Sequence, residues 1–263
     1  FCYTLGTLVL VVIAIQLWFV GHLVYWSSYN PSSTAFMDRY LEKPGARLRH
    51  TWVPYHRISE HLKRAVVAAE DAKFLDHEGF DWEGIQKALE KNQKKGKVVA
   101  GGSTISQQLA KNLFLNNERT IERKAKEASL AIWLETRLTK NEILKLYLDR
   151  AYMGGGTFGV DGAAHFYFNK SARDVNLAES AMLAGLFKAP TKYAPHINLP
   201  AARARANIVL DNLVDAGFMT EGQVFGARRN PAMAVDRRDE NSPNYYLDFA
   251  FEEMRKLVDT FPK

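Results

Sequence analysis

The sequence has a single cysteine, Cys2, among its 263 residues, so no disulfide can form within the chain. Hydrophobic residues make up 47% of the chain, which is enough to bury a core without such a cross-link. Segments typical of β-strands are sparse, whereas helix-capping residues recur along the chain. The sequence therefore predicts a mainly α-helical fold.

Charged residues are also lacking at the N-terminus, where none precedes Asp38 and residues 3–26 are almost wholly apolar. A helix of that length can cross a hydrocarbon layer of about 30 Å. The run is too long for a cleaved signal peptide and has no convincing cleavage site of small residues. We therefore expect a transmembrane anchor at residues 1–27, with Trp18, Tyr25 and Trp26 placed to lie near a membrane interface.

The chain as a whole is basic, with a net charge of +6 and a pI near 9.2. Such a balance favours an anionic partner, which can be nucleic acid, an anionic lipid head group or a diphosphate. No nucleic-acid recognition motif occurs, and the predicted anchor would hold the chain at a membrane. The sequence therefore favours a membrane-bound anionic substrate and no nucleic acid.

Helix signals begin after a connector that we expect at residues 28–58. They predict a helical domain at residues 59–230, followed by a C-terminal linker at residues 231–263. The expected helix starts and boundaries are Ser59, Asp81, Ser103, a long helix over residues 120–138, Thr139 with Glu142, Asn176 with Glu179, Pro200 to Gly217, Thr220 with Gln223, and Ser242–Pro243.

Two stretches interrupt the helical pattern. Residues 91–97 hold four lysines and a glycine, and residues 154–156 with Gly159 form a run of glycines. We expect a loop at the first stretch and a flexible patch at the second. A solvated surface loop is the ordinary meaning of such a lysine run.

Four segments have residue types that can carry chemistry: residues 70–79, 101–108, 123–127 and 140–148. In the second, Gly101 and Gly102 precede a helix start, whose free amides suit an anion such as phosphate. Each segment also has an ordinary structural interpretation. These are a solvated glutamate, a loop with an N-cap, a ladder of surface ion pairs, and capping with packing.

Together the segments resemble glycosyltransferase family 51, the peptidoglycan transglycosylase domain of class A penicillin-binding proteins and of monofunctional relatives. The family pattern Glu-Asp-x-x-Phe-x-x-His-x-Gly matches residues 70–79, and Gly-Gly-Ser-Thr-Ile-x-Gln-Gln matches residues 101–108. Arg-Lys-x-x-Glu matches residues 123–127, and Lys-x-Glu-Ile-Leu matches residues 140–144. Two positions depart from the family: Asp149 stands where Asn is usual and Phe187 where Pro is usual.

The resemblance implies a lysozyme-like fold with a mobile, membrane-proximal subdomain at about residues 92–117. It implies that Glu70 is the catalytic base and that Glu127 is the second essential carboxylate. It also implies Mg²⁺ or Mn²⁺ in many family members, although no ligand set in this sequence is specific for a metal. The substrate-binding residues that it implies are Asp71, Phe74, His77, Gly102, Ser103, Thr104, Gln107, Gln108, Lys111, Arg123 and Lys124.

The implied partners are lipid II, a glycan chain growing on polyprenyl diphosphate, the membrane, and proteins of the divisome or elongasome. The implied location is the bacterial inner membrane, with the catalytic domain on its outer side. Residues 241–263 resemble the linker that leads to a transpeptidase in class A proteins, yet no Ser-x-x-Lys motif with a Lys-Thr-Gly partner is present. On the strength of the linker resemblance, we expect a longer, bifunctional protein that also carries a transpeptidase.

Two other functions fit parts of the pattern. A lysozyme-like hydrolase or lytic transglycosylase is also built around one glutamate, but it needs neither an anion site nor Arg123 and Lys124. A non-catalytic membrane scaffold would not need Glu70 and Glu127. A sugar-release assay on finished peptidoglycan separates the hydrolase from the transferase.

Overall fold

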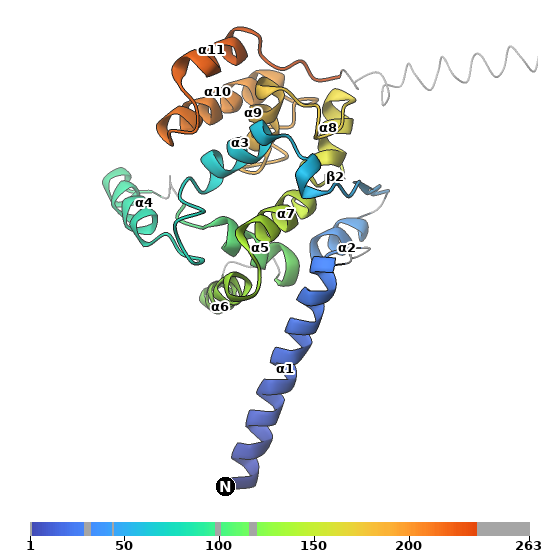
Figure 1. Ribbon diagram of the computed structural model, residues 1–263, viewed down its shortest axis with the longest axis vertical. Helices are drawn as coiled ribbons and strands as arrows, with labels where there is room; N and C mark the ends of the chain where they lie inside the picture. Colours follow the sequence, from blue (N-terminus) through green and yellow to red (C-terminus); the bar gives the residue numbers. More distant parts are fainter. Residues whose placement is uncertain (1, 29–32, 44, 98–100, 116–119, 236–263) are drawn as a thin grey trace, which may run out of the picture. The chain divides into compact units, whose positions relative to one another are not determined.

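The computed structural model describes residues 2–28, 33–43, 45–97, 101–115 and 120–235. The chain divides into two compact units, and Figure 1 shows its helices and strands coloured along the sequence. The first comprises Phe1–Leu48 and Glu78–Arg150, and the second comprises Arg49–His77 and Ala151–Lys263. Each unit is therefore built from two separate stretches of the chain.

The first unit is helical throughout its described elements. Its helices are α1 (Cys2–Ser28), α2 (Ala35–Leu41), α4 (Trp82–Lys95), α5 (Ile105–Phe114), α6 (Ile121–Arg137) and α7 (Lys140–Arg150).

Helix α5 forms the centre of this unit, because it packs against α2, α6 and α7. Its residues Ile105, Leu109 and Leu113 are buried at the spacing of one helix face. Leu134 of α6 and Ile143 of α7 are buried as well. The hydrophobic spacing of the sequence thus places α5 between its neighbours.

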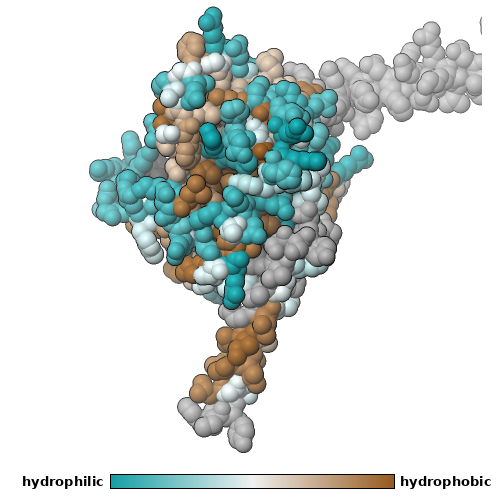
Figure 2. All heavy atoms as spheres, in the orientation of Figure 1, coloured by the Kyte–Doolittle hydropathy of each residue, from teal (hydrophilic) through white to brown (hydrophobic). Residues whose placement is uncertain are grey.

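Helix α1 spans 27 residues and exposes large apolar side chains along its length, including Leu10, Leu17 and Trp18. The brown surface of this helix in Figure 2 shows the same apolar character. Among the helices in the described part of the chain, none meets both the length and the apolar character of a membrane span. The transmembrane anchor expected at residues 1–27 is therefore not confirmed.

The second unit is mainly helical and contains one short parallel pair of strands. Its elements are β1 (Arg49–His50), the 3₁₀ turn η1 (Tyr55–Arg57), α3 (Glu60–Glu70), β2 (Thr157–Phe158), α8 (Val160–Phe168), α9 (Leu177–Leu186), α10 (Leu199–Asp215) and α11 (Glu221–Arg229). Strand β1 pairs with β2 in the register Arg49 to Thr157.

Helix α9 is the core of the second unit. It packs against α3 and α10, and all its residues from Ala178 to Leu186 are buried. Helix α3 presents Leu62, Ala65 and Val66 to this core. Because a buried helix requires apolar residues on every side, the absence of charges from residues 180–186 explains its central position.

Most of the predicted helix starts are confirmed. Asp81 accepts a hydrogen bond from the amide of Gly84 at 2.9 Å, and Asn176 with Glu179 forms a reciprocal capping box. Thr139 and Glu142 exchange the same two bonds at the start of α7, which ends at Arg150. The helix expected after Ser242–Pro243 lies outside the described residues.

Two predicted caps were wrong in detail. Ser59 precedes α3, but its hydroxyl donates to the carbonyl of Val175 at 3.3 Å and makes no cap bond. Ser103 was expected to start the next helix, but Thr104 caps α5 and shares a capping box with Gln107. In both cases a tertiary or neighbouring partner competes successfully for the serine hydroxyl.

The two predicted interruptions also differ from expectation. The lysine run does not break the helix, because α4 continues to Lys95 and ends at Gly96, whose φ is +61°. The connector at residues 28–58 contains α2, β1 and η1.

The glycine run is closely packed instead of forming the expected flexible patch. A Cβ on Gly154 would lie 2.7 Å from the carbonyl oxygen of Pro190, and one on Gly155 would lie 2.4 Å from the ring of Phe166. Both glycines have positive φ angles, +83° and +59°, so side chains are disfavoured there by conformation as well as by space.

Candidate active site

The carboxylate of Glu70 lies at the last residue of α3 in the second unit, and its side chain is 9% exposed. Its Oε1 is 3.9 Å from a guanidinium nitrogen of Arg205, which projects from α10. Burial disfavours a negative charge, and a nearby cation offsets that cost. Glu70 is thus a largely buried carboxylate that lies beside the largely buried guanidinium of Arg205.

Arg205 was not among the residues singled out from the sequence. It reaches this position because α9 has a glycine opposite it: a Cβ on Gly185 would lie 2.9 Å from Cγ of Arg205. The available signal was a charged residue within a helix that buries Ala202, Ala206 and Val209. Arginine is rarely buried unless it has a partner, so that pattern points to an ion pair.

The turn after Glu70 is fixed by a second pair. Nε2 of His77 lies 3.1 Å and 3.0 Å from the two carboxylate oxygens of Asp71, and both side chains are almost fully buried. Phe74, which lies between Asp71 and His77 in the sequence, is also buried. Its ring is edge-on to that of His77, with 6.3 Å between the ring centroids. The structure therefore brings Glu70, Asp71, Phe74 and His77 together, and we call these four residues the Glu70 cluster.

A second group of candidate residues lies in the first unit, around the start of α5. Thr104 donates its hydroxyl to the carbonyl of Gly79 at 2.7 Å, and its amide donates to Oε1 of Gln107 at 3.2 Å. Gly102 leaves no room for a side chain, since a Cβ there would lie 2.9 Å from Cα of Ile85. Thr104 and Gln107 thus serve the structure of the helix start and are buried.

Ser103 is the more accessible member of this segment. Its hydroxyl accepts a hydrogen bond from Nζ of Lys124 at 3.0 Å. Lys124 lies on α6 and is 48% exposed, so its ammonium group is within reach of a solute. Ser103 and Lys124 therefore form an accessible, positively charged pair.

Glu127, in contrast, is 4% exposed and holds two cations. Arg123 donates to its Oε2 at 2.6 Å, and Lys124 contacts its Oε1. The sequence left open whether this segment was a solvated ladder of ion pairs. Because Glu127 is buried, the segment is not a ladder of fully solvated ion pairs.

The remaining candidates also lie on α5. Gln108 accepts a hydrogen bond from the hydroxyl of Tyr147 at 2.8 Å, and Lys111 is partly exposed on the same helix. We call the first-unit group the Glu127 cluster, with members Gly102, Ser103, Thr104, Gln107, Gln108, Lys111, Arg123, Lys124 and Glu127.

The lysine segment of α7 takes part in a hydrogen-bonded network with α5 and α6. Lys140 donates to Oε1 of Glu135 at 2.8 Å, and the hydroxyl of Ser106 donates to the same oxygen at 2.5 Å. Glu135 thereby joins α5, α6 and α7. This network holds the helices that carry the Glu127 cluster.

The described residues do not form a metal site on their own. Within them, no three His, Cys, Asp or Glu side chains are close enough together to bind one ion. The carboxylate of Glu127 is already matched by two cationic groups. The divalent cation implied by the family resemblance therefore has no complete set of protein ligands in the described residues.

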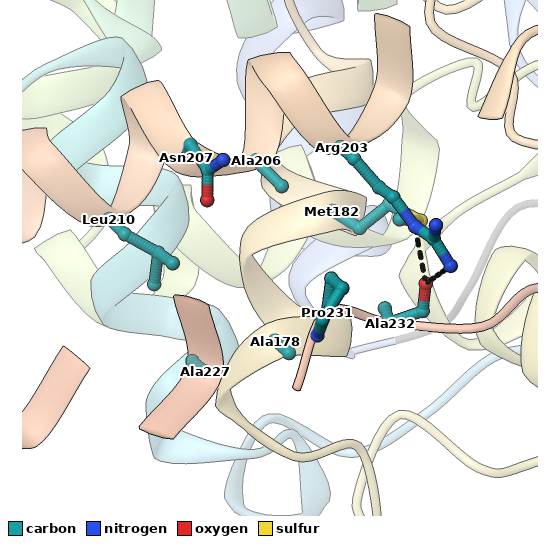
Figure 3. Close-up of a pocket in the computed structure, with 9 residues that line it drawn as sticks. All are labelled: Ala178, Met182, Arg203, Ala206, Asn207, Leu210, Ala227, Pro231 and Ala232. Carbon is teal, nitrogen blue, oxygen red and sulfur yellow. Dashed lines mark hydrogen bonds between the residues drawn. The ribbon is translucent and has the colours of Figure 1, made fainter. Parts of the chain in front are cut away.

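A small cavity in the second unit is unrelated to either cluster. It is lined by residues of α9, α10 and α11, and Figure 3 shows the guanidinium of Arg203 in its lining donating to the carbonyl of Ala232 at 3.4 Å. Its volume of about 10 Å³ is roughly the space for one water molecule. It is too small for a sugar.

Comparison with known proteins identifies the segment that contains both clusters. The family model described as Transglycosylase matches residues 37–214. A biosynthetic peptidoglycan transglycosylase of Chromobacterium violaceum is 47% identical over 210 residues, which cover 78% of this chain and 92% of that protein. The protein of the same description from Methylobacillus flagellatus is 51% identical over 207 residues, covering 77% and 90% of the two chains.

A third protein of that description, from Laribacter hongkongensis, is 52% identical over 188 residues and covers 70% and 82% of the two chains. The crystal structure of penicillin-binding protein 1A from Haemophilus influenzae aligns with 80% of this chain and 21% of its own at 22% identity. Its TM-score of 0.45 is too low to bear on the fold.

Proposed function

Since the chain belongs to the transglycosylase family of peptidoglycan glycosyltransferases, we propose that it polymerises lipid II into glycan strands. The donor is a glycan chain on polyprenyl diphosphate, and the acceptor is the 4-hydroxyl of a second lipid-linked disaccharide. The acceptor oxygen forms a bond to the anomeric carbon as the bond from that carbon to the diphosphate breaks. Attack from the opposite face inverts the anomeric configuration from α to β.

Glu70 is the proposed general base, and its burial against Arg205 is the observation that carries this proposal. A sugar hydroxyl is a weak nucleophile at neutral pH, so a positioned carboxylate that takes its proton contributes roughly 10²–10⁴-fold in rate. The carboxylate must be ionised to accept that proton. The guanidinium at 3.9 Å favours this ionised form.

Cations can take the place of a general acid in stabilising the departing diphosphate. It leaves as a stabilised anion, and cationic groups that are already in place stabilise the charge that develops on it. Lys124 and Ser103 supply an accessible ammonium and hydroxyl 3.0 Å apart. We assign this pair to the diphosphate, with Gln108 and Lys111 on α5 as further polar contacts.

Glu127 is proposed to position the cations without touching substrate. It is buried and its two oxygens are directed at Arg123 and Lys124. Such a carboxylate fixes the direction of both side chains and lowers the cost of holding two positive charges close together. A divalent cation stays a proposal as well, since Mg²⁺ usually binds one or two carboxylates together with substrate phosphates.

The neighbouring Asp71 does not supply a second working carboxylate beside Glu70. Such enzymes use one carboxylic acid and one further carboxylate beside the scissile bond. The neighbouring Asp71 has both oxygens within hydrogen-bonding distance of His77 and is almost fully buried. It is therefore committed to the turn and unsuited to be that second carboxylate.

The membrane anchor also belongs to the proposal. Helix α1 has no charged residue and exposes Leu10, Val12 and Leu17. A substrate with a polyprenyl chain stays in the bilayer, so an enzyme that acts on it must work at the membrane surface. We propose that α1 holds the catalytic domain at the inner membrane of a bacterium, on its outer side, where divisome or elongasome proteins are candidate partners.

The deciding experiment compares two substrates. The full chain in detergent is incubated with fluorescent lipid II and, separately, with finished peptidoglycan. A transferase converts lipid II into a polymer that lysozyme digests and leaves the finished wall intact. Release of soluble sugar fragments from the wall, with lipid II unchanged, would replace this proposal with the hydrolase.

A further inference from the structure

Two adjacent glutamines lie near the start of α5, and each is held through its side-chain oxygen. Oε1 of Gln107 accepts a hydrogen bond from the amide of Thr104 at 3.2 Å and closes the capping box of the helix. Oε1 of Gln108 accepts a hydrogen bond from the hydroxyl of Tyr147 at 2.8 Å. The first bond is local, whereas the second joins α5 to α7 across 39 residues of sequence. Only the bond to Gln108 is therefore a tertiary contact.

Tyr147 is fixed by its surroundings on α7. Its side chain is 1% exposed, and its neighbours Leu146 and Leu148 are fully or almost fully buried. Helices α5 and α7 pack against each other and lie side by side in Figure 1. A tyrosine ring packed in this way cannot move without disturbing the core, and its buried hydroxyl requires a hydrogen-bond partner. The hydroxyl of Tyr147 is thus a fixed point to which Gln108 is attached.

This attachment determines how the amide of Gln108 is turned. A glutamine amide has two unlike ends of nearly the same shape, because the oxygen accepts hydrogen bonds and the nitrogen donates them. A half-turn of the amide exchanges the two ends. The hydroxyl of Tyr147 selects one of these orientations by donating to the oxygen. Nε2 branches from the same carbon atom, so the donating end of Gln108 is directed away from that hydroxyl.

The neighbours of Gln108 along the chain indicate what its donating end suits. Gln108 is partly exposed, and so is Lys111 one turn further along α5. Ser103, just before the helix, accepts a hydrogen bond from the ammonium group of Lys124 at 3.0 Å. An anion gains from an amide N–H added to two such cations, whereas the amide oxygen would repel it. The orientation that Tyr147 selects is therefore the one that favours an anionic ligand.

We propose that Tyr147 is a positioning residue, which holds the amide of Gln108 with its nitrogen toward the diphosphate of the donor. The inference rests on the proposed function, which assigns Gln108 to that diphosphate. Tyr147 itself touches no substrate. It acts by turning the amide before the ligand arrives, which removes the cost of ordering it during binding. The competing explanation is that Gln108 only satisfies the buried hydroxyl of Tyr147.

A binding measurement tests the role of the hydroxyl without turnover. The full chain in detergent is titrated with a fluorescent polyprenyl diphosphate. Tyr147→Phe removes only the hydroxyl and should raise Kd roughly fivefold, the size expected for one hydrogen bond. Tyr167→Phe is the matched control, because it removes the hydroxyl of another buried tyrosine, which donates to the carbonyl of Met153 at 2.9 Å. This control should bind as the wild type does. Equal Kd values for Tyr147→Phe and Tyr167→Phe would overturn the proposal.

Gln108→Glu tests whether the donating end matters. A carboxylate still accepts the hydroxyl of Tyr147, so melting should stay near that of the wild type. It has no N–H to donate, however, and it carries a charge of the same sign as the ligand. Binding of polyprenyl diphosphate should therefore weaken by about a hundredfold. If Gln108→Glu binds as tightly as the wild type, Gln108 serves only the buried hydroxyl and the proposal is wrong.

A double-mutant cycle tests whether Tyr147 acts through Gln108. Gln108→Leu alone should weaken binding about tenfold, because it removes the donor. In that background Tyr147→Phe should cause no further loss, since there is no amide left to turn. A second fivefold loss in the double variant would show that the hydroxyl supports only the packing of α7.

Binding and polymer formation together separate this inference from the function on which it rests. If the variants weaken the binding of polyprenyl diphosphate as expected but the wild type forms no polymer from lipid II, the role of Tyr147 stands and the polymerase proposal fails. If the wild type forms polymer while the variants bind as it does, the polymerase stands and the role of Tyr147 fails.

Discussion

Glu70 and Arg205 form a pair between the end of α3 and the middle of α10, with 3.9 Å between the carboxylate and the guanidinium. Both side chains are close to fully buried, at 9% and 11% exposure. Burying a carboxylate or a guanidinium alone costs free energy, and in a pair each charge lowers the cost of burying the other. This pair links the candidate base to the core of the second unit, and it leads to the first two predictions.

Glu70→Gln should abolish polymerisation and leave the fold intact. The amide has nearly the same shape as the carboxylate but cannot accept the acceptor's proton, so a rate loss of about 10²–10⁴-fold is expected. The measurement is lipid II turnover together with thermal melting. Glu221→Gln on α11 is a control in the same unit, because Glu221 is exposed. Retention of more than about a tenth of the wild-type rate would contradict the role of a base.

Arg205→Met should lower both stability and rate, because it leaves the carboxylate of Glu70 buried without its cation. A double-mutant cycle tests whether this effect passes through Glu70. In the Glu70→Gln background the loss of the guanidinium should be less costly, with a coupling free energy of about 0.5–3 kcal/mol from chemical unfolding. Equal costs in both backgrounds would show that Arg205 acts only through packing against α9.

Lys124→Ala should reduce the rate by about 10²–10³-fold, because the departing diphosphate loses a preorganised cation. Melting should stay near that of the wild type, since Lys124 is half exposed and Arg123 still neutralises Glu127. Lys124→Arg should give a partial loss, because it keeps the charge but changes the hydrogen-bond geometry.

The same helix provides the control for that prediction. Lys126 pairs with Glu122 at 2.6 Å, and both side chains are well exposed. Lys126→Ala removes an equivalent charge from the exposed side of the helix and should change neither turnover nor melting. A Lys124→Ala variant as active as Lys126→Ala would show that Lys124 has no part in turnover.

Asp149→Asn should destabilise the protein by about 3 kcal/mol. Asp149 and Arg150 are both buried at the end of α7. Burial lowers the pKa of Arg150 to about 10, and the carboxylate of Asp149 opposes that shift by stabilising the guanidinium charge. Chemical unfolding of the wild type and the variant measures the change, and Asp149→Leu tests whether packing alone explains it. Stability equal to the wild type in Asp149→Asn would show that the charge has no role.

Local signals in the sequence predicted the helices well. Thr139 with Glu142 and Asn176 with Glu179 are three residues apart, so one helix turn is enough to bring their groups together. Arg123 and Glu127 are four residues apart on one helix face, and this spacing predicted their contact. The family pattern then identified the segments that hold the candidate residues.

Relationships that depend on packing could not be predicted in this way. The hydroxyl of Ser59 bonds to Val175 instead of capping its helix, because a carbonyl from a distant segment lies beside it. Arg205 meets Glu70 at a place where α9 carries Gly185, and a Cβ on that glycine would lie 2.9 Å from Cγ of the arginine. Likewise, the glycines at 154–156 suggested flexibility, whereas Phe166 and Pro190 fill the space that side chains would need.

Gly102 has a comparable consequence for how far this segment can vary. Because a Cβ there would lie 2.9 Å from Cα of Ile85, any side chain would force α4 and the start of α5 apart. Ser103 is the next residue, so the same movement would shift its hydroxyl relative to Nζ of Lys124. A substitution at residue 102 would therefore disturb the packing of α4 and the geometry of the accessible pair in one step.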